Sequence, residues 1–233
     1  SRMTGKGVAV NFLITLGVIG MSLAIVLSKS RSGLFLLALT FLLFIELTVL
    51  YAGMMKHRQV WIIKFLKVIF LIITLMALYI GVDSMISRFS LDNLLQEGRP
   101  LYWGNVVETI KDFPLLGTGL GTFAAVYPAY EKVGVEGLLL HAHNDFLEYF
   151  SELGLLGFFL LSGLVLFLLV NSFLVWKKRR YPEAREMALG CIIASTVMLI
   201  HSFTDFNLHI PANMLLFSVV LSLAYVTVYY RKS

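Results

Sequence analysis

The sequence predicts an all-α integral membrane protein with about six transmembrane helices and one large helical extracytoplasmic loop. Three observations predict this fold class. Of the 233 residues, 58% are hydrophobic and only 14% are charged, whereas a soluble domain carries about 25% charged residues. Apolar runs of about 20 residues, long enough to cross a hydrocarbon layer, recur along the chain. The basic residues gather between these runs in a pattern that fits one orientation.

Six spans follow from the apolar runs, within a single membrane domain over residues 1–233. They cover residues 7–27, 33–55, 61–81, 155–176, 187–207 and 211–230.

Basic residues predict the orientation, because cytoplasmic loops are enriched in Lys and Arg. A six-span arrangement with both termini in the cytoplasm places 13 of the 19 basic residues inside, whereas the opposite orientation would place them outside and is rejected. These are Arg2, Lys6, Lys56, Arg58, Lys64, Lys67, Lys177, Lys178, Arg179, Arg180, Arg185, Arg231 and Lys232. The chain is therefore expected to cross a membrane several times, which in a bacterium is the cytoplasmic (inner) membrane.

The long segment 82–153 then lies outside the cytoplasm and is expected to form short helices. Pro100 suits the first turn of a helix over 101–111 that ends before Pro114. The segment Gly-Thr-Gly-Leu-Gly at 117–121 predicts a flexible turn; no strand precedes it and no Lys-Ser/Thr pair follows, so it is not a nucleotide-binding loop. Asn144 can cap a helix that runs through Glu152 and stops at Gly154.

Lys29 and Arg31 form the first group that could carry chemistry. They lie in a short extracytoplasmic turn, where positive charge opposes the topology rule. One interpretation is a cationic clamp for a lipid phosphate, because guanidinium binds phosphate oxygens in a bidentate fork. The other is that both side chains reach toward lipid headgroups from the interface.

Arg99 precedes the aromatic pair Tyr102 and Trp103. An arginine followed by aromatic residues at a membrane surface could hold a phosphate or stack on a sugar. The alternative is an interfacial aromatic anchor.

The densest polar cluster, at 141–145, reads His-Ala-His-Asn-Asp and opens a helix. A neutral imidazole of His141 or His143 can accept a proton from a sugar hydroxyl near neutral pH, and a helix N-terminus such as the one at Asn144 favours an anion. Metal binding lacks enough further ligands in the sequence, so no metal site is predicted. Helix capping without a catalytic role is the remaining interpretation.

A second polar group, His201, Asp205 and His209, recurs every four residues at the outer end of the predicted fifth span. On a helix these side chains would form one stripe. Ionisable groups at membrane depth often mark a functional path, and a hydrogen-bonded packing cluster is the alternative.

Other binding classes are not supported. The lone cysteine, Cys191, forms no intrachain disulfide, and no Cys/His spacing indicates zinc. The basic residues flank the spans and do not cover a soluble face, so nucleic acid is not expected as a partner. We expect no cofactor.

Several motifs together resemble the O-antigen ligase family. They are Arg99-Pro-Leu-Tyr-Trp103, the segment 112–123, and His143-Asn144 followed by nine residues and Gly154-Leu-Leu-Gly157. Ser30-Arg31-Ser32-Gly33 resembles the arginine turn of that family, and the segment 201–213 resembles the part that often follows the loop. Since family members usually have more spans, the resemblance falls on their C-terminal half.

This resemblance implies a membrane glycosyltransferase. The donor would be a glycan on a polyprenyl diphosphate in the membrane lipid, and the acceptor a hydroxyl of lipid A core, polysaccharide or protein at the outer membrane face. The resemblance assigns His143 as the base and Arg31 and Arg99 as diphosphate binders. It implies an active face outside the cytoplasm and chemistry without ATP or metal.

Two other functions compete with this one. A transporter typically shows inverted repeats and broken helices at mid-membrane, whereas this chain has no internal repeat and its polar residues lie near the outer face. A non-catalytic membrane subunit of polysaccharide assembly would leave the pattern of Arg31, Arg99 and His143 unexplained. The enzyme is therefore favoured.

Overall fold

The computed structural model describes residues 5–28, 30–50, 68, 99–131, 139–179 and 181–230. Every described element is a helix, so the predicted all-α class is confirmed for these residues. The predicted third span, apart from Val68, and the first part of the outer loop lie outside them. The chain divides into two compact units, Ser1–Ser90 and Leu91–Ser233. Each is described by itself, and the single membrane domain stays a prediction.

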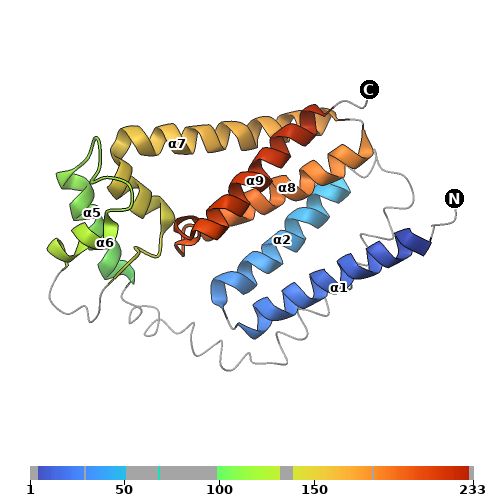
Figure 1. Ribbon diagram of the computed structural model, residues 1–233, viewed down its shortest axis with the longest axis horizontal. Helices are drawn as coiled ribbons and strands as arrows, with labels where there is room; N and C mark the ends of the chain where they lie inside the picture. Colours follow the sequence, from blue (N-terminus) through green and yellow to red (C-terminus); the bar gives the residue numbers. More distant parts are fainter. Residues whose placement is uncertain are drawn as a thin grey trace. The chain divides into compact units, whose positions relative to one another are not determined.

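The first unit contains a pair of apolar helices, α1 (Gly5–Leu27) and α2 (Arg31–Leu50), which pack side by side (Figure 1). Ser30 caps α2, because its hydroxyl accepts a hydrogen bond from the Gly33 amide at 3.1 Å. The helix therefore begins two residues before the predicted start of the second span. A side chain on Gly33 would meet Ile25 Cγ2 at 3.3 Å, so glycine permits this close approach.

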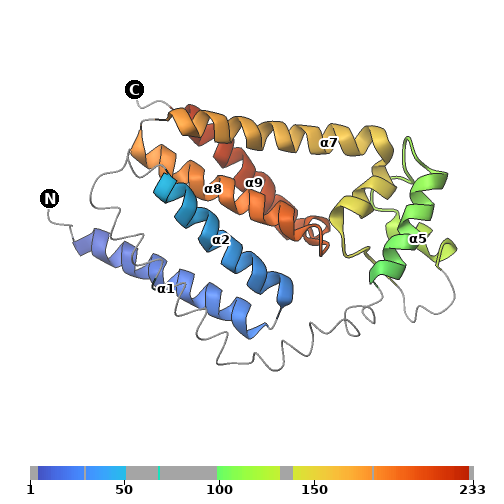
Figure 2. The same ribbon diagram turned by 180° about the vertical axis from the view of Figure 1, so that it is seen from behind.

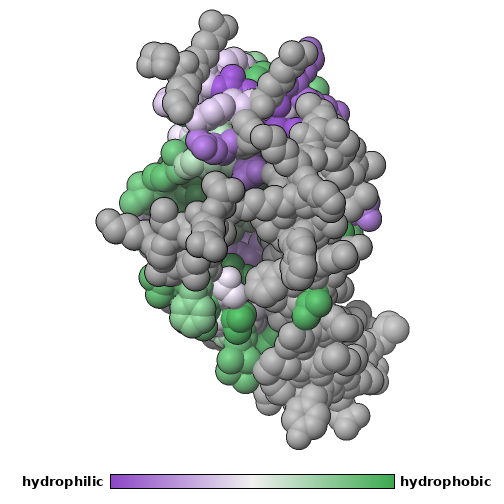
Figure 3. All heavy atoms as spheres, turned by 90° about the vertical axis from the view of Figure 1, so that its right-hand side faces the viewer, coloured by the Kyte–Doolittle hydropathy of each residue, from purple (hydrophilic) through white to green (hydrophobic). Residues whose placement is uncertain are grey.

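Three long helices dominate the second unit, namely α7 (Asp145–Lys178), α8 (Pro182–His201) and α9 (Pro211–Tyr229). They pack against one another, as Figures 1 and 2 show from opposite sides. Of the described helices, these three are long and apolar enough to cross a membrane. Large hydrophobic side chains such as Phe159 and Leu160 are exposed on α7, and hydrophobic residues also reach the surface in Figure 3. Such surfaces suit a lipid environment.

Helix α7 breaks at Gly154, which has φ 61° and ψ −172°. Its first part, capped by Asn144, is set at an angle to the long second part (Figure 1). The prediction of a capped helix that stops at Gly154 is therefore confirmed, although helix resumes at once. The break leaves backbone groups that the loop at 114–119 satisfies: Gly119 donates to the Glu152 carbonyl at 2.8 Å, and Leu155 donates to the Pro114 carbonyl at 2.8 Å.

The glycine-rich turn at 117–121 is thus packed against α7, and the prediction of a flexible turn needs correction. Gly117, Gly119 and Gly121 all have positive φ. A side chain on Gly117 would lie 2.3 Å from the backbone of Glu152. Glycine is required there by contact with the broken helix as well as by turn geometry.

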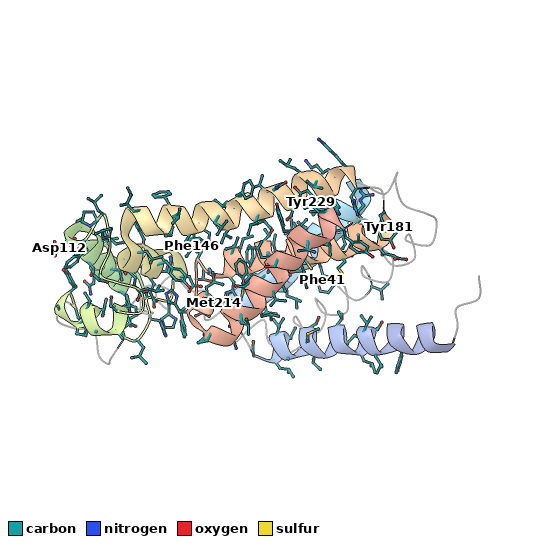
Figure 4. The ribbon with its side chains drawn as sticks, turned by 45° about the horizontal axis from the view of Figure 1, so that its top comes forward. Phe41, Asp112, Phe146, Tyr181, Met214 and Tyr229 are labelled. Carbon is teal, nitrogen blue, oxygen red and sulfur yellow. The ribbon has the colours of Figure 1, made fainter. Side chains whose placement is uncertain are left out.

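The segment before the histidine cluster forms a small helical layer. Helix α5 (Arg99–Asp112) confirms the predicted helix with proline in its first turn. It is followed by α6 (Phe123–Val126) and the 3-10 helix η3 (Tyr127–Ala129). This layer and the histidine loop share a core of Val106, Phe123, Tyr127 and Ala142. Figure 4 shows Asp112 and Phe146 toward one end of this unit and Tyr181 and Tyr229 toward the other.

The predicted fifth span, 187–207, differs from the structure. Helix α8 begins at Pro182, which suits a first helical turn, and ends at His201. Beyond His201 the backbone hydrogen bonds span three residues, as in a 3-10 helix, and no longer four. The Thr204 amide, for example, donates to the His201 carbonyl at 2.9 Å. The Asp205 carboxylate accepts from the next amide, that of Phe206, at 3.0 Å, and such local bonding competes with helix. The predicted single helical stripe is therefore wrong: His209 lies in a separate 3-10 turn, η4 (Asn207–His209).

Candidate functional site

The site is built on the loop that leads into α7. Asn144 caps the helix by accepting a hydrogen bond from the Leu147 amide at 3.1 Å, as predicted. His143 has φ 51°, the one positive value that the described non-glycine residues adopt. Residues other than glycine rarely adopt this backbone conformation, and residues that do are found most often at functional sites. The backbone therefore presents the His143 ring at a local energetic cost.

The peptide between the two histidines is fixed from both sides. The Trp103 indole N–H donates to the Ala142 carbonyl at 3.0 Å, and the Ala142 amide donates to Glu148 Oε2 at 2.7 Å. Ala142 itself is fully buried. Helices α5 and α7 thus determine where His141 and His143 lie.

His141 forms a tight pair with Glu148. Its Nδ1 lies 2.8 Å from Oε1 of that carboxylate, and the ring stacks on Phe206 with centroids 4.4 Å apart. An ionised carboxylate only accepts hydrogen bonds, so Nδ1 carries the proton and Nε2 keeps its lone pair when the ring is neutral. The His141 side chain is 32% exposed, whereas Glu148 is buried.

His143 is held more loosely. Its Nδ1 lies 3.5 Å from Asp205 Oδ1, beyond hydrogen-bond length, and the ring meets the edge of Phe206 at 4.9 Å. Asp205 also lies 3.9 Å from His201 Nε2. Asp205 therefore lies near two imidazoles, and Phe206 contacts the rings of both His143 and His141.

Behind the histidines lies a buried polar network, formed by Asp145, Glu148, Glu152 and His209. The three carboxylates share one face of the first part of α7, because their spacing of three and four residues matches the helical period. Each is 1% exposed. His209 Nδ1 lies 2.6 Å from Asp145 Oδ1, and the Leu208 amide donates to Asp145 Oδ2 at 2.9 Å. The network therefore joins α7 to η4.

Two more contacts secure this junction. The Asp145 amide donates to the Ser202 carbonyl at 2.8 Å. The Tyr149 hydroxyl donates to the Leu208 carbonyl at 2.9 Å and lies 3.8 Å from the sulfur of Met214, labelled in Figure 4. The turn between α8 and α9 is thus tied to α7.

The electrostatics of His209 follow from these neighbours. Burial lowers its pKa, but the hydrogen bond to Asp145 and the nearby carboxylates of Glu152 and Glu148 outweigh that effect and raise the pKa to about 9. In the absence of any other cation, the ring is therefore an imidazolium at neutral pH. One positive ring then faces three carboxylates.

This arrangement suits proton transfer better than anion binding. The described side chains supply carboxylates and imidazoles on the same side of the unit. Such a surface can orient a hydroxyl and accept its proton, since carboxylates favour the protonated imidazole that results. A diphosphate needs cations from elsewhere.

The side chains of the other predicted binding residues lie outside the described part of the chain. Arg31 begins α2 in the first unit, and Arg99 begins α5 in the second; both are described by their backbone alone. Lys29 lies outside the described residues. Their roles stay predictions.

Sequence reasoning missed three contributors: Glu148, Glu152 and Phe206. A signal existed for the two glutamates, because Asp145, Glu148 and Glu152 follow the helical spacing within the predicted capped helix. No sequence signal indicated the contact of Phe206 with both histidine rings, because this contact depends on how the turn after α8 folds back. Trp103 was expected at a sugar or an interface, which stays a prediction; the bond from its indole N–H to the histidine loop was not foreseen.

These features define a helical membrane protein whose polar site is built where a capped, broken helix meets the turn of a helical pair. A family model described as "O-Antigen ligase" matches residues 16–162. The chain belongs to this family, whose members serve polysaccharide biosynthesis.

A curated relative supports the same assignment. The exopolysaccharide production protein ExoQ of Rhizobium meliloti (strain 1021) is 27% identical over 138 residues, which is 56% of this chain and 31% of ExoQ. The chain thus spans about a third of the length of that relative. No solved structure matches the chain.

Proposed function

We propose that this chain carries the catalytic loop of an O-antigen ligase-type glycosyltransferase. It moves a glycan from a polyprenyl-diphosphate carrier to an acceptor hydroxyl at the outer face of a bacterial cytoplasmic membrane. The acceptor is lipid A core, a growing polysaccharide or a protein. The family assignment and the similarity to ExoQ support polysaccharide assembly; the carrier and reaction are our inference.

The geometry of His143 carries the proposal. The ring follows a strained backbone angle, is 35% exposed, and belongs to the His-Asn-x9-Gly-x-x-Gly motif. Asp205 lies beside Nδ1 and stabilises the charged ring that forms on proton uptake. These are properties of a general base that is held ready by its surroundings.

The reaction balances without a further reagent. The acceptor hydroxyl loses its proton to His143, and its oxygen forms a bond to the anomeric carbon of the donor glycan. The bond between that carbon and the diphosphate oxygen breaks, and the electron pair leaves with the lipid diphosphate. The donor is already activated, so the scheme uses neither ATP nor a metal at the reacting atoms.

Cations must stabilise the leaving diphosphate. We assign this role to Arg31 and Arg99, with Lys29 beside Arg31, because a guanidinium binds phosphate oxygens in pairs. His141 and Asn144 orient the loop, and His201 and His209 support it with Asp205.

Histidine substitutions test the base. His143→Ala should insert and fold but lose about 10²–10⁴-fold in transfer rate, the usual effect of losing a general base. His141→Ala should be milder, because His141 lies outside the family motif. Transfer of lipid-linked glycan is measured per unit of membrane-inserted protein. An inactive His141→Ala variant beside a nearly normal His143→Ala variant would reject the assignment.

Arginine substitutions test the leaving-group site. Arg31→Ala and Arg99→Ala should weaken use of the lipid-diphosphate donor at limiting concentration. Lys at either position should rescue only in part, since an ammonium cannot form the bidentate fork. Wild-type rates for both Ala variants would reject the proposal that these arginines bind the diphosphate. Interaction of their side chains with lipid headgroups would then be the remaining interpretation.

A further inference from the structure

We propose that Glu148, Glu152 and His209 bind one divalent transition-metal cation, for which Zn²⁺ is the best match. The sequence predicted no metal site, because the histidine cluster lacks enough further ligands along the chain and no Cys/His spacing indicates zinc. The ligands come together only when the turn after α8 brings His209 against α7. This inference does not rest on the proposed function.

Distances among the three side chains fit a coordination site. His209 Nε2 lies 3.6 Å from Glu148 Oε1 and 3.8 Å from Glu152 Oε2, and one ligand atom from each of the three residues lies within 4.8 Å of the others. These separations are too long for hydrogen bonds. Ligands about 2.0–2.2 Å from a tetrahedral zinc ion lie roughly 3.3–3.6 Å apart, close to the two separations from His209 Nε2.

Two of these atoms are buried without a hydrogen-bond partner among the described residues. They are Glu152 Oε2 and His209 Nε2, on side chains that are 1% and 9% exposed. Buried polar atoms are nearly always satisfied, so two such atoms that face each other point to a missing ligand between them. A cation satisfies both at once.

The remaining atoms of the ligands are oriented as in metal centres. His209 Nδ1 contacts Asp145 at 2.6 Å, which directs Nε2 toward the two glutamates. Glu148 Oε2 accepts from the Ala142 amide at 2.7 Å, and Glu152 Oε1 accepts from the Phe123 amide at 2.9 Å. Metal-binding histidines and carboxylates are usually held by such outer contacts.

Charge favours a metal ion over a proton alone. Asp145, Glu148 and Glu152 bring three buried carboxyl groups around one imidazole, that of His209. A divalent ion supplies two positive charges to this group, whereas a proton on the ring supplies one. Imidazole with two carboxylates suits zinc among the common divalent ions, and manganese is the nearest competitor.

The ion would have a structural role. It lies behind the histidine loop and ties the first part of α7 to η4. The backbone amide at the start of α6 also contacts it indirectly through Glu152. The acceptor hydroxyl instead meets His143, so the ion is separate from the reacting atoms.

Metal content of the full chain tests the site directly. The protein is purified in detergent, stripped with a chelator, loaded by dialysis against Zn²⁺ and freed of excess metal. We expect about one Zn²⁺ per chain by mass spectrometry of the metal, with the three protein ligands and a water completing a tetrahedral site. Manganese loaded in the same way should bind more weakly. Wild-type protein that retains less than about a tenth of an equivalent of either metal overturns the proposal.

A matched pair of variants separates this site from surface binding. Glu152→Gln keeps the shape of the side chain but removes an anionic ligand, and should lower zinc affinity by at least about 10-fold. Glu108→Gln changes an exposed glutamate paired with Lys111 on α5 and should bind like wild type. Equal binding by Glu152→Gln overturns the site.

A further measurement covers the case in which Glu152→Gln does not fold. Co²⁺ added to stripped wild-type protein should give the visible absorption of a four-coordinate site, and Zn²⁺ should abolish it. No such absorption would overturn the proposal. These readouts are independent of glycan transfer, so either proposal can fail alone.

Discussion

At the scale of single residues, the histidine loop is positioned by groups that never meet the substrate in our scheme. The Ala142 peptide is the clearest example, because its carbonyl and amide are each bound by one side chain, Trp103 and Glu148. A loop with a positive φ at His143 needs such support, since the strained conformation persists only where its surroundings determine it.

We predict that Trp103→Phe lowers glycan transfer several-fold while the protein still folds. The change leaves the Ala142 carbonyl without its donor, which typically costs about 1–3 kcal/mol when the group is buried, and lets the His143 ring move. The measurement is transfer per unit of folded protein. Tyr130→Phe is the control, because it removes an exposed hydroxyl bond to Asp112. Equal activity of the two variants would show that the indole bond does not position the loop.

At the scale of elements, the broken helix α7 connects the site to the membrane. The first part carries the buried carboxylates and the second part is apolar. The break at Gly154 redirects the chain, and the loop at 114–119 satisfies the freed backbone groups.

Gly154→Ala should therefore destabilise the fold. Its φ of 61° with ψ of −172° is nearly restricted to glycine and costs on the order of 1–3 kcal/mol for other residues. A side chain would also lie 2.4 Å from the Leu115 carbonyl carbon. Gly163→Ala in the same helix meets nothing within 4 Å and should be neutral or slightly stabilising. Thermal unfolding in detergent compares the two; equal midpoints would contradict the account of the break.

Sequence predicted those parts of the fold that depend on local chemistry. The cap at Asn144, the break at Gly154 and the proline in the first turn of α5 are signals carried by a few adjacent residues. The path after His201 could not be predicted in this way. The predicted span continues past it through Phe203 and Phe206. Local hydrogen bonds of Thr204 and Asp205, and the distant bond that the Leu208 amide of η4 donates to Asp145, determine the turn instead.

The same distinction between local signals and tertiary contacts applies to the candidate site. His141, His143 and Asn144 stand together in the sequence and could be identified from it. The pairing of His209 with Asp145 joins residues 64 positions apart and depends on tertiary packing.

At the scale of the whole molecule, orientation across the membrane decides whether the proposed function is possible. Within the second unit, the part of α7 beyond Gly154 is a continuous apolar helix that runs from the site to Lys178. Basic residues Lys177, Lys178 and Arg179 gather at its far end. Because Lys and Arg remain on the cytoplasmic side, the histidine loop should be outside.

Single-cysteine labelling tests this orientation. In a Cys191→Ser background, a cysteine at position 130 should react with a membrane-impermeant reagent in intact cells. A cysteine at position 178 should react only after the membrane is permeabilised, because α7 separates the two positions by one crossing. A permeant reagent that labels both is the control for accessibility. Labelling of position 178 but not position 130 in intact cells would place His143 in the cytoplasm. The extracytoplasmic orientation would then be wrong, and the scheme of transfer at the outer face would fail with it.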